Sequence, residues 1–145
     1  MRTSYVQWLV LAGLTLGAAA FADATRETLT SPDGRVAITF LLEDDTPRYS
    51  VSCAGTELIR PSPLGFVLQD APPLTNGFEL VDALRETGDE TWRPVWGTAA
   101  EVRNHYNQLT VRLRERNEPR REMTLVFRAH NDGAAFRYIL PAQSN

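Results

Sequence analysis

The stretch EMTLVFRAHNDGAAFRYIL, Glu122 to Leu140, predicts two antiparallel strands joined by a tight turn. Asn131-Asp132-Gly133 supplies the turn signal, since Asp-Gly is a leading two-residue hairpin sequence. The strand before this turn carries apolar residues at every second position, which predicts one buried and one solvated sheet face. These inward-facing residues are Met123, Leu125 and Phe127.

The segment before this hairpin, EVRNHYNQLTVRLRE from Glu101 to Glu115, has the same alternation. Leu109, Val111 and Leu113 fall on one face, as in a half-solvated antiparallel strand. Asn117 to Pro119 is predicted to turn this strand back toward the next one. Three consecutive strands of a sheet are therefore predicted over residues 101–140.

Near the start of the chain, RVAITFLL from Arg35 to Leu42 alternates in the same way. In the preceding Ser31-Pro-Asp-Gly34, Pro presets a turn dihedral, Asp closes an Asx-type hydrogen bond and Gly accepts a positive φ. A hairpin of Glu27–Thr30 with Arg35–Leu42 is therefore predicted. Its inward face is predicted to carry Val36, Ile38, Phe40 and Leu42.

The middle of the chain alternates between short strand-like runs and turn signals. Residues 78–86 fit a helix in part, but a strand is favoured, with Phe78, Leu80 and Leu84 on one face and a turn at 87–90. About nine to eleven strands of about 5–8 residues are expected in total. The chain is thus predicted to be all-β, an antiparallel sandwich. The other expected segments are a turn at 43–47, strands at 48–53, 55–59 and 62–68, a loop at 69–77 and a strand at 91–96.

Residues 1–24 have the composition of a secretory signal peptide. Arg2 precedes an apolar run from Val6 to Phe21, and two overlapping A-x-A sites end at Ala22 and Ala24. A membrane anchor is the alternative, but the apolar run is short for a bilayer span. Export to the periplasm or outside the cell is expected, with no membrane span after cleavage and a single domain over residues 25–145.

Composition excludes some classes of function. The formal net charge is −3 and all fifteen basic residues are Arg, so no electrostatic footprint for nucleic acid is expected. Cys53 is the only Cys, so no internal disulfide can form, and a small buried residue is predicted there. His105 and His130 are isolated in their segments and are predicted to be structural hydrogen-bonding residues.

Acidic residues gather at 43–45 and 89–90, and their carboxylate oxygens could serve as calcium ligands. Neither cluster has the spacing of a calcium loop, and acidic residues are common at turns. Two carboxylates could in principle hydrolyse a glycoside, but sequence alone cannot place such a pair across a sugar. No catalytic residue and no metal ligand is therefore predicted in this chain.

The aromatic and amide residues near the middle of the chain are the one candidate contact site. Flat rings beside amides suit stacking on sugars and hydrogen bonding to them, while core or interdomain packing is the alternative. The candidate residues, for carbohydrate or interdomain contact, are Trp92, Trp96, His105, Tyr106 and Asn107.

Five segments in this order together resemble the N-terminal domain of glycoside hydrolase family 97: SPDGRVAITF, RYSVSCAG, SPLGFVL, WRPVWGTAAEVRNHYNQLTVRL and FRAHNDGAAFRYIL. The resemblance covers nearly all of the chain after the predicted signal peptide. The set NHYNQLTV followed by NDGAAFRY carries most of the specificity. The family usually has Glu at the position of Gln108, and commonly also where Thr98 stands.

The resemblance implies a fold and a function. The fold is a galactose-mutarotase-like β-super-sandwich, of which this chain lacks the C-terminal side. Family members are exported bacterial enzymes that act on α-glucosides or α-galactosides, with a (β/α)8 catalytic barrel downstream. The N-terminal domain packs on the barrel and helps to shape the active site.

In the family, calcium binds to the full-length enzyme, and the Glu that this domain contributes lies beyond the end of the present sequence. The resemblance therefore implies that this chain holds no cofactor. Its expected partners are its own barrel and an α-linked oligosaccharide. It is expected to be marginally folded and inactive alone, as the non-catalytic part of an exo-acting enzyme, favoured as an α-glucosidase.

Two other functions are compatible with the residues. One is a stand-alone secreted β-sandwich that binds carbohydrate through Trp92, Trp96 and Tyr106. The other is an extracellular structural sandwich without a ligand. The downstream coding sequence separates these from the first interpretation, because only a glycosidase would continue into a barrel.

Overall fold

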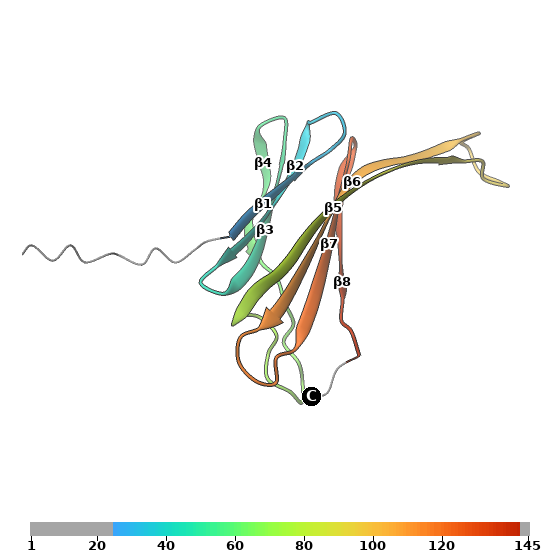
Figure 1. The fold of residues 1–145 in the computed structure, drawn as a ribbon. Coiled ribbons are helices and arrows are strands. Elements are labelled where there is room, and N and C mark those ends of the chain that lie inside the picture. Colours follow the sequence, from blue (N-terminus) through green and yellow to red (C-terminus); the bar gives the residue numbers. More distant parts are fainter. Residues whose placement is uncertain (1–24, 143–145) are drawn as a thin grey trace, which may run out of the picture.

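A computed structural model describes residues 25–142, which form eight strands in two four-stranded antiparallel sheets (Figure 1). In each sheet the strands follow sequence order, so every neighbouring pair is joined as a hairpin or by a longer turn. The predicted antiparallel sandwich is confirmed, with fewer strands than expected. The strands are β1 (Thr25–Thr30), β2 (Val36–Glu43), β3 (Thr46–Cys53) and β4 (Thr56–Pro63), then β5 (Phe78–Trp92), β6 (Val102–Glu115), β7 (Glu122–His130) and β8 (Gly133–Ile139).

The core lies between the two sheets and is made by the alternating residues. All ten side chains that were predicted to face inward in β2, β6 and β7 are at most 7% exposed. Because side chains of a strand point alternately to opposite faces, the buried face follows from the period of two. These residues are Val36, Ile38, Phe40, Leu42, Leu109, Val111, Leu113, Met123, Leu125 and Phe127.

The turn between β1 and β2 forms as its sequence predicts. Ser31 Oγ donates to Asp33 Oδ1 at 2.6 Å and accepts from the backbone N–H of Val36 at 3.0 Å. Asp33 Oδ1 also accepts from the backbone N–H of Arg35, and Gly34 has φ +75°. The hydrogen bond from Ser31 is the main cause that lowers the pKa of Asp33.

The turn between β7 and β8 packs beside the first turn. His130 pairs with Gly133, so the two-residue loop is Asn131 and Asp132, while Gly133 already belongs to β8. Asn131 Oδ1 accepts from the backbone N–H of Asp33 at 3.0 Å. This bond links one end of the first sheet to the same end of the second.

Two predicted elements are wrong. The strand expected at 62–68 does not form, because β4 ends at Pro63 and the chain then has only an isolated bridge, Phe66 to Leu74. Gly65 lies against the Leu74 carbonyl, where an added Cβ would come within 2.3 Å, and it has φ +143°. Here the glycine allows two backbone segments to cross, which is a tertiary requirement that local pattern does not reveal.

The turn expected at 87–90 is also absent, because β5 continues through these residues to Trp92. Each of them is paired with a residue of β6, including Gly88 with Tyr106. Long-range pairing therefore overrides the local turn tendency of Gly and Asp. The strand expected at 91–96 contributes only its first two residues, to the end of β5.

A bulge at Val81 corrects a third prediction. The β5–β6 register shifts between Leu80 and Asp82, so the extra residue reverses which positions face inward. Ala83 takes the inward place opposite Val111, and Leu84 faces outward at 53% exposure.

Cys53, expected to be buried, is instead partly exposed at the end of β3.

The feature that positions the candidate site is a projecting hairpin. β5 and β6 stay paired as far as Trp92 and Val102, but β6 pairs with β7 only from Tyr106 onward. Residues Asp89–His105 thus form a two-stranded extension, here named the β5–β6 arm, that leaves the sheets (Figure 1, yellow to orange). The predicted signal peptide lies outside the described residues, and none of these residues forms a helix able to cross a membrane.

Candidate functional site

The five candidate residues lie on the β5–β6 arm and at its base, but on different faces. Trp92 and Tyr106 occupy even-numbered positions of paired strands and project to the outer face of the second sheet. His105 and Asn107 project to the opposite face. Trp96 lies in the loop at the tip of the arm, so the structure does not bring the five side chains together as one cluster.

The tip of the arm is apolar and open to solvent. Trp96 is 88% exposed, Val95 is 95% exposed and Trp92 is 48% exposed. Neither indole belongs to the core of the described residues, which removes core packing as the explanation for these two tryptophans. The remaining explanation for these two tryptophans is contact with another molecule or with another part of a larger protein.

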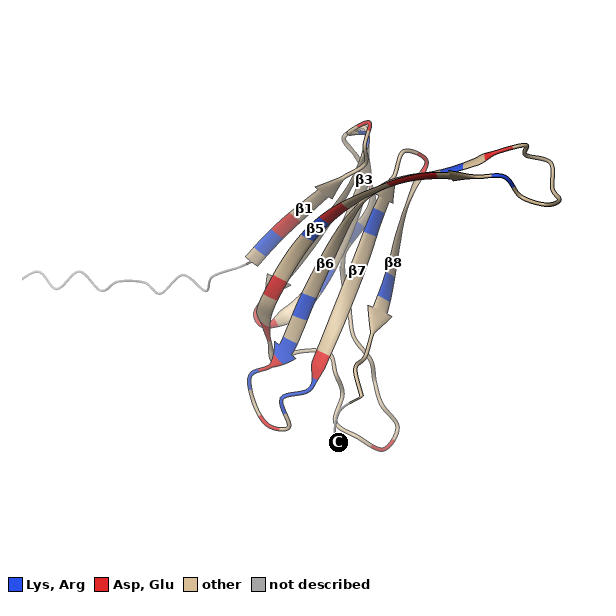
Figure 2. Ribbon diagram, turned by 45° about the vertical axis from the view of Figure 1, so that its right-hand side comes forward, with Lys and Arg blue, Asp and Glu red and all other residues tan. Residues whose placement is uncertain are grey.

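The charged side chains of the arm pair with polar side chains of the arm itself. Arg103 donates two hydrogen bonds to the Asp89 carboxylate, both at 2.7 Å, and this interaction is the main cause that lowers the pKa of Asp89. Arg93 donates two to Glu101, at 3.0 and 2.8 Å. Figure 2 shows these charged residues along the projecting strands. Each pair is held by two hydrogen bonds, which favours one arm geometry.

At the base of the arm, an aromatic ring covers a glycine. An added Cβ on Gly88 would lie 2.5 Å from the Tyr106 ring, which packs directly over this position. The guanidinium of Arg128 lies 4.1 Å from the same ring centroid. The His130 ring lies beside Tyr106, with the centroids 5.5 Å apart and the planes tilted by 49°. Tyr106 is therefore held by neighbours on both sides, as in an aromatic residue that covers a strand glycine.

A polar row crosses three strands next to this ring. Arg128 Nε donates to Gln108 Oε1 at 2.7 Å, and Gln108 Nε2 donates to Glu86 Oε2 at 2.6 Å. An amide can both accept from the cation and donate to the anion, which an ionised carboxylate cannot do. Gln108 is thus matched to Glu86, and a carboxylate at position 108 would face a second carboxylate.

Asn107 is engaged within the protein. Its Nδ2 donates to the carbonyl of Thr30 in β1 at 2.8 Å, and its Oδ1 accepts from the hydroxyl of Thr87 at 3.0 Å. The amide therefore joins the two sheets below the arm. It lines a polar groove of about 310 Å³, in which Arg85 pairs with Glu27 at 2.6 Å.

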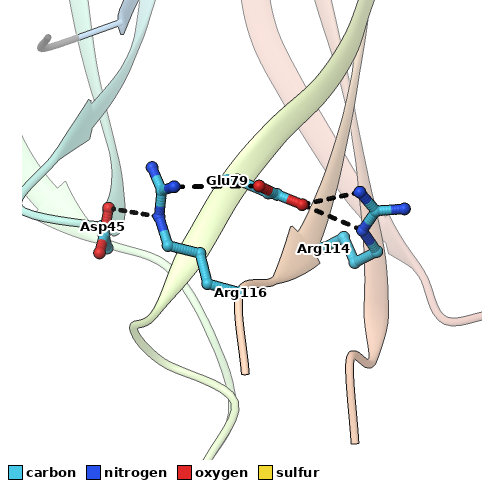
Figure 3. A network of polar contacts seen from close by, with 4 residues as sticks. All are labelled: Asp45, Glu79, Arg114 and Arg116. Atoms are coloured by element: carbon cyan, nitrogen blue, oxygen red, sulfur yellow. Dashed lines mark hydrogen bonds and ion pairs between the residues drawn. The ribbon is translucent and has the colours of Figure 1, made fainter. Parts of the chain in front are cut away.

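At the end of the second sheet away from the arm, a chain of ion pairs links the two sheets (Figure 3). Arg114 donates to Glu79 at 2.7 Å, Glu79 lies 3.9 Å from Arg116, and Arg116 donates to Asp45 at 3.2 Å. The Arg114 bond is the main cause that lowers the pKa of Glu79. Sequence analysis missed this network, because alternating Arg residues on a strand look like an ordinary solvated face.

The most buried ion pair lies nearby. Arg121 is 6% exposed and donates through Nε and Nη2 to Glu115, whose side chain is 12% exposed. Its Nη1 and Nη2 also donate to the carbonyls of Pro72 and Pro73. This side chain therefore fixes the loop before β5 against the turn after β6.

The acidic clusters do not form a calcium site in the described residues. Asp45 pairs with Arg116 and Asp89 with Arg103, so guanidinium groups occupy their carboxylates. No three His, Cys, Asp or Glu side chains gather within residues 25–142 in a way that could hold a metal. The carboxylates of these two clusters therefore do not fit a calcium ion.

The two sheets are open along the side formed by their edge strands β4 and β8. An apolar cleft of about 260 Å³ lies there, between Leu58 and Ile59 of β4 and Ala134 and Phe136 of β8. The buried Phe127 is part of the lining of this cleft. The opposite side of the sandwich is closed by the contacts of Arg85 and Asn107 with β1.

Comparisons with known proteins agree on one family. A family model described as the glycosyl-hydrolase 97 N-terminal domain matches residues 29–145. A retaining alpha-galactosidase of Bacteroides thetaiotaomicron is 33% identical over 112 residues, which are 77% of this chain and 16% of that protein. The chain thus spans about a sixth of the length of this relative.

Solved structures give the same result. A glycoside hydrolase family 97 enzyme of Pseudoalteromonas sp. strain K8, in complexes with panose and with acarbose, superposes with a TM-score of 0.77 at 30% identity. A beta-arabinopyranosidase gives 0.71 at 25% identity. Each match covers 81% of this chain and 18% of the other chain.

Proposed function

Because the chain belongs to the glycosyl-hydrolase 97 N-terminal family, we propose that it is the non-catalytic β-sandwich portion of a secreted, exo-acting α-glycosidase. The enzyme would hydrolyse O-glycosidic bonds of oligosaccharides, with catalysis on a downstream (β/α)8 barrel. The observation that carries this proposal is the extent of the match: nearly the whole of residues 25–145 matches the family model, and the aligned region makes up 16–18% of the related glycosidases. The domain would pack on the barrel and help to shape its active site.

Three carboxylates of the chain lack the property that a catalytic acid needs. Glycoside hydrolysis needs a general acid whose pKa is raised, so that it holds a proton near neutral pH. Arginine instead lowers the pKa of Glu79, Asp89 and Glu115, by hydrogen bonding in each case. These three carboxylates are therefore ionised and hydrogen-bonded to arginine. We propose calcium dependence only for the full-length enzyme.

For the substrate we propose an α-linked glucoside. The Pseudoalteromonas structures, 30% identical to this chain, are complexes with panose and acarbose. The second candidate is an α-galactoside, which the 33% identical retaining alpha-galactosidase favours. Parallel assays with aryl α-glucoside, aryl α-galactoside and aryl β-arabinopyranoside would rank these substrates for the full-length enzyme.

We also propose that further strands of the same domain complete the sandwich along β4 and β8. Support comes from the apolar cleft between these edge strands and from the exposure of Leu58 and Phe136 beside it, 63% and 39%. Open edges and exposed apolar faces are normally covered in native sheets. The residues 25–145 would then be one unfinished domain.

Export is proposed from the composition of residues 1–24. Cleavage after the A-x-A sites would leave a mature chain that begins near residue 23 or 25. N-terminal sequencing of the protein recovered from a bacterial periplasm tests this, and an intact Met1 in that fraction would contradict it.

Hydrolysis assays test the main proposal. The purified 145-residue chain is expected to release no detectable aglycone from aryl α-glycosides, whereas the longer gene product is expected to do so. Hydrolysis by the chain alone would contradict the non-catalytic role. If the gene ends after Asn145 and the folded monomer binds α-linked oligosaccharides in calorimetry, a stand-alone carbohydrate-binding module is the correct function.

A further inference from the structure

The β5–β6 arm lacks the support that the rest of the second sheet has. Within residues 25–142, no third strand pairs with it beyond Tyr106. An isolated two-stranded hairpin is marginally stable in water, so an extension of this kind gains stability when it lies on another surface. The arm nevertheless leaves the sandwich in a defined direction, because Tyr106 and Asn107 are held at its base.

The arm exposes both paired charged groups and apolar groups. Its five Asp, Glu and Arg side chains are all paired within the arm: Asp89 with Arg103, Arg93 with Glu101, and Glu90 with Asn104. The Arg93 side chain is 82% exposed, but its guanidinium is bonded to Glu101. The exposed apolar groups at the tip are two indoles and one isopropyl group. Such groups are typical anchors in protein interfaces, where a tryptophan inserted into a pocket carries much of the binding energy.

We propose that the β5–β6 arm is a clasp that grips the catalytic domain of the same polypeptide, with Trp92, Val95 and Trp96 as its anchors. This inference rests on the proposed function, since it needs the barrel as occupant. More than four fifths of the length of each relative lies outside the region matched here. A domain tethered to this one is present at high effective concentration, so a small apolar contact suffices to hold it.

A protein surface fits the tip better than a sugar does. A carbohydrate platform combines an aromatic ring with hydrogen-bonding groups that are available to hydroxyls. The charged groups of the arm are already paired within the arm. The side chain of Val95, which is 95% exposed, has no flat ring on which a sugar could stack. The internal ion pairs also stiffen the arm before it docks, which lowers the entropy lost on binding.

Hydrogen–deuterium exchange of the full-length enzyme tests the clasp. Amides of residues 89–105 are expected to exchange roughly 10–100 times more slowly in the wild-type enzyme than in the full-length double variant Val95→Ser, Trp96→Ser. Val67→Ser is the matched control, because Val67 is as exposed as Trp96, 88%, and lies outside the arm. It is expected to leave exchange of the arm unchanged.

The outcomes separate this inference from the proposed function. A wild-type enzyme that hydrolyses aryl α-glycosides, yet exchanges its arm amides as fast as the double variant, would overturn the clasp alone. So would protection of the arm in the isolated chain by maltotriose, which would instead make the tip a sugar platform. A gene product without glycosidase activity would overturn the proposed function, and the clasp would lose its occupant with it.

Discussion

Arg121 shows how much one side chain can organise in a β-sandwich. It satisfies two proline carbonyls and a carboxylate while only 6% of its side chain is exposed. A buried charge is costly unless it is paired and hydrogen-bonded, so Glu115 is needed to keep Arg121 in place. Neither residue stood out in the sequence, because Arg-rich turns are usually solvated. Only the fold brings residues 72–73 against position 121.

Replacing Glu115 with Gln is expected to reduce the free energy of unfolding at pH 7 by about 2–3 kcal/mol. Arg121 would keep one acceptor oxygen at position 115 but would lose its counter-charge. Arg121 lowers the pKa of Glu115 below its ordinary 4.5, so the stabilisation is present above that value and is lost as pH falls through the folded-state pKa. Urea unfolding should therefore show a difference that is constant from pH 6 to 8 and shrinks below pH 4.5.

The control for this prediction is Glu57→Gln. Glu57 is exposed and only 3.7 Å from an exposed Arg60, so its loss should change stability by less than about 0.5 kcal/mol. A difference between wild type and Glu115→Gln that persists unchanged at pH 3 would contradict the role given to the carboxylate.

At the scale of secondary-structure elements, alternation predicted which segments form strands and, in three of them, which residues face the core. It did not predict the length of β5 or which of its residues face the core. β2, β6 and β7 bury the residues that the period of two indicates. In β5, the bulge at Val81 and the pairing of Gly88 with Tyr106 depend on the partner strand. The same pairing carries the strands past the sheet as the β5–β6 arm. A window of one strand contains no information on how far its neighbour extends.

Gly88→Val is expected to disturb the arm at its base. The new side chain meets the Tyr106 ring, which lies 2.5 Å from the site of the added Cβ, and the ring must leave its stack with Arg128. A net destabilisation of about 1 kcal/mol is expected, since overpacking outweighs the higher strand propensity of Val. Thermal unfolding measures it. Gly133→Val is the matched control, because nothing lies within 4 Å of that position, and equal effects of the two substitutions would refute the contact.

At the scale of the whole molecule, the two sides of the sandwich differ. The β1–β5 side is closed by polar contacts of Arg85 and Asn107, while the β4–β8 side is open over apolar residues. A domain that is finished along one side and open along the other fits a piece of a larger fold. This asymmetry follows from the arrangement of strands and has no counterpart in composition.

Ala134→Leu is expected to change stability in opposite directions in the two forms of the protein. In the 145-residue chain the larger side chain partly fills the open cleft, for a gain of about 1 kcal/mol. In the full-length enzyme, where further strands would occupy the cleft, it should cost about 1–3 kcal/mol through overpacking. Denaturant unfolding of both forms measures this, with the nearly isosteric Ala134→Ser as control. Stabilisation in both forms would contradict completion of the sandwich by further strands.

The sequence by itself determined the all-β class, the hairpins at 31–34 and 131–133 and the inward residues of three strands, because pleating and turn chemistry are local. It also placed the candidate aromatic residues near one another along the chain. Only the tertiary structure decided that Trp92 and Tyr106 face one way and His105 and Asn107 the other, and that Trp96 stands at an exposed tip. The face of a strand residue depends on the bulges and the register of its partner, and the exposure of a side chain depends on which strands end beside it.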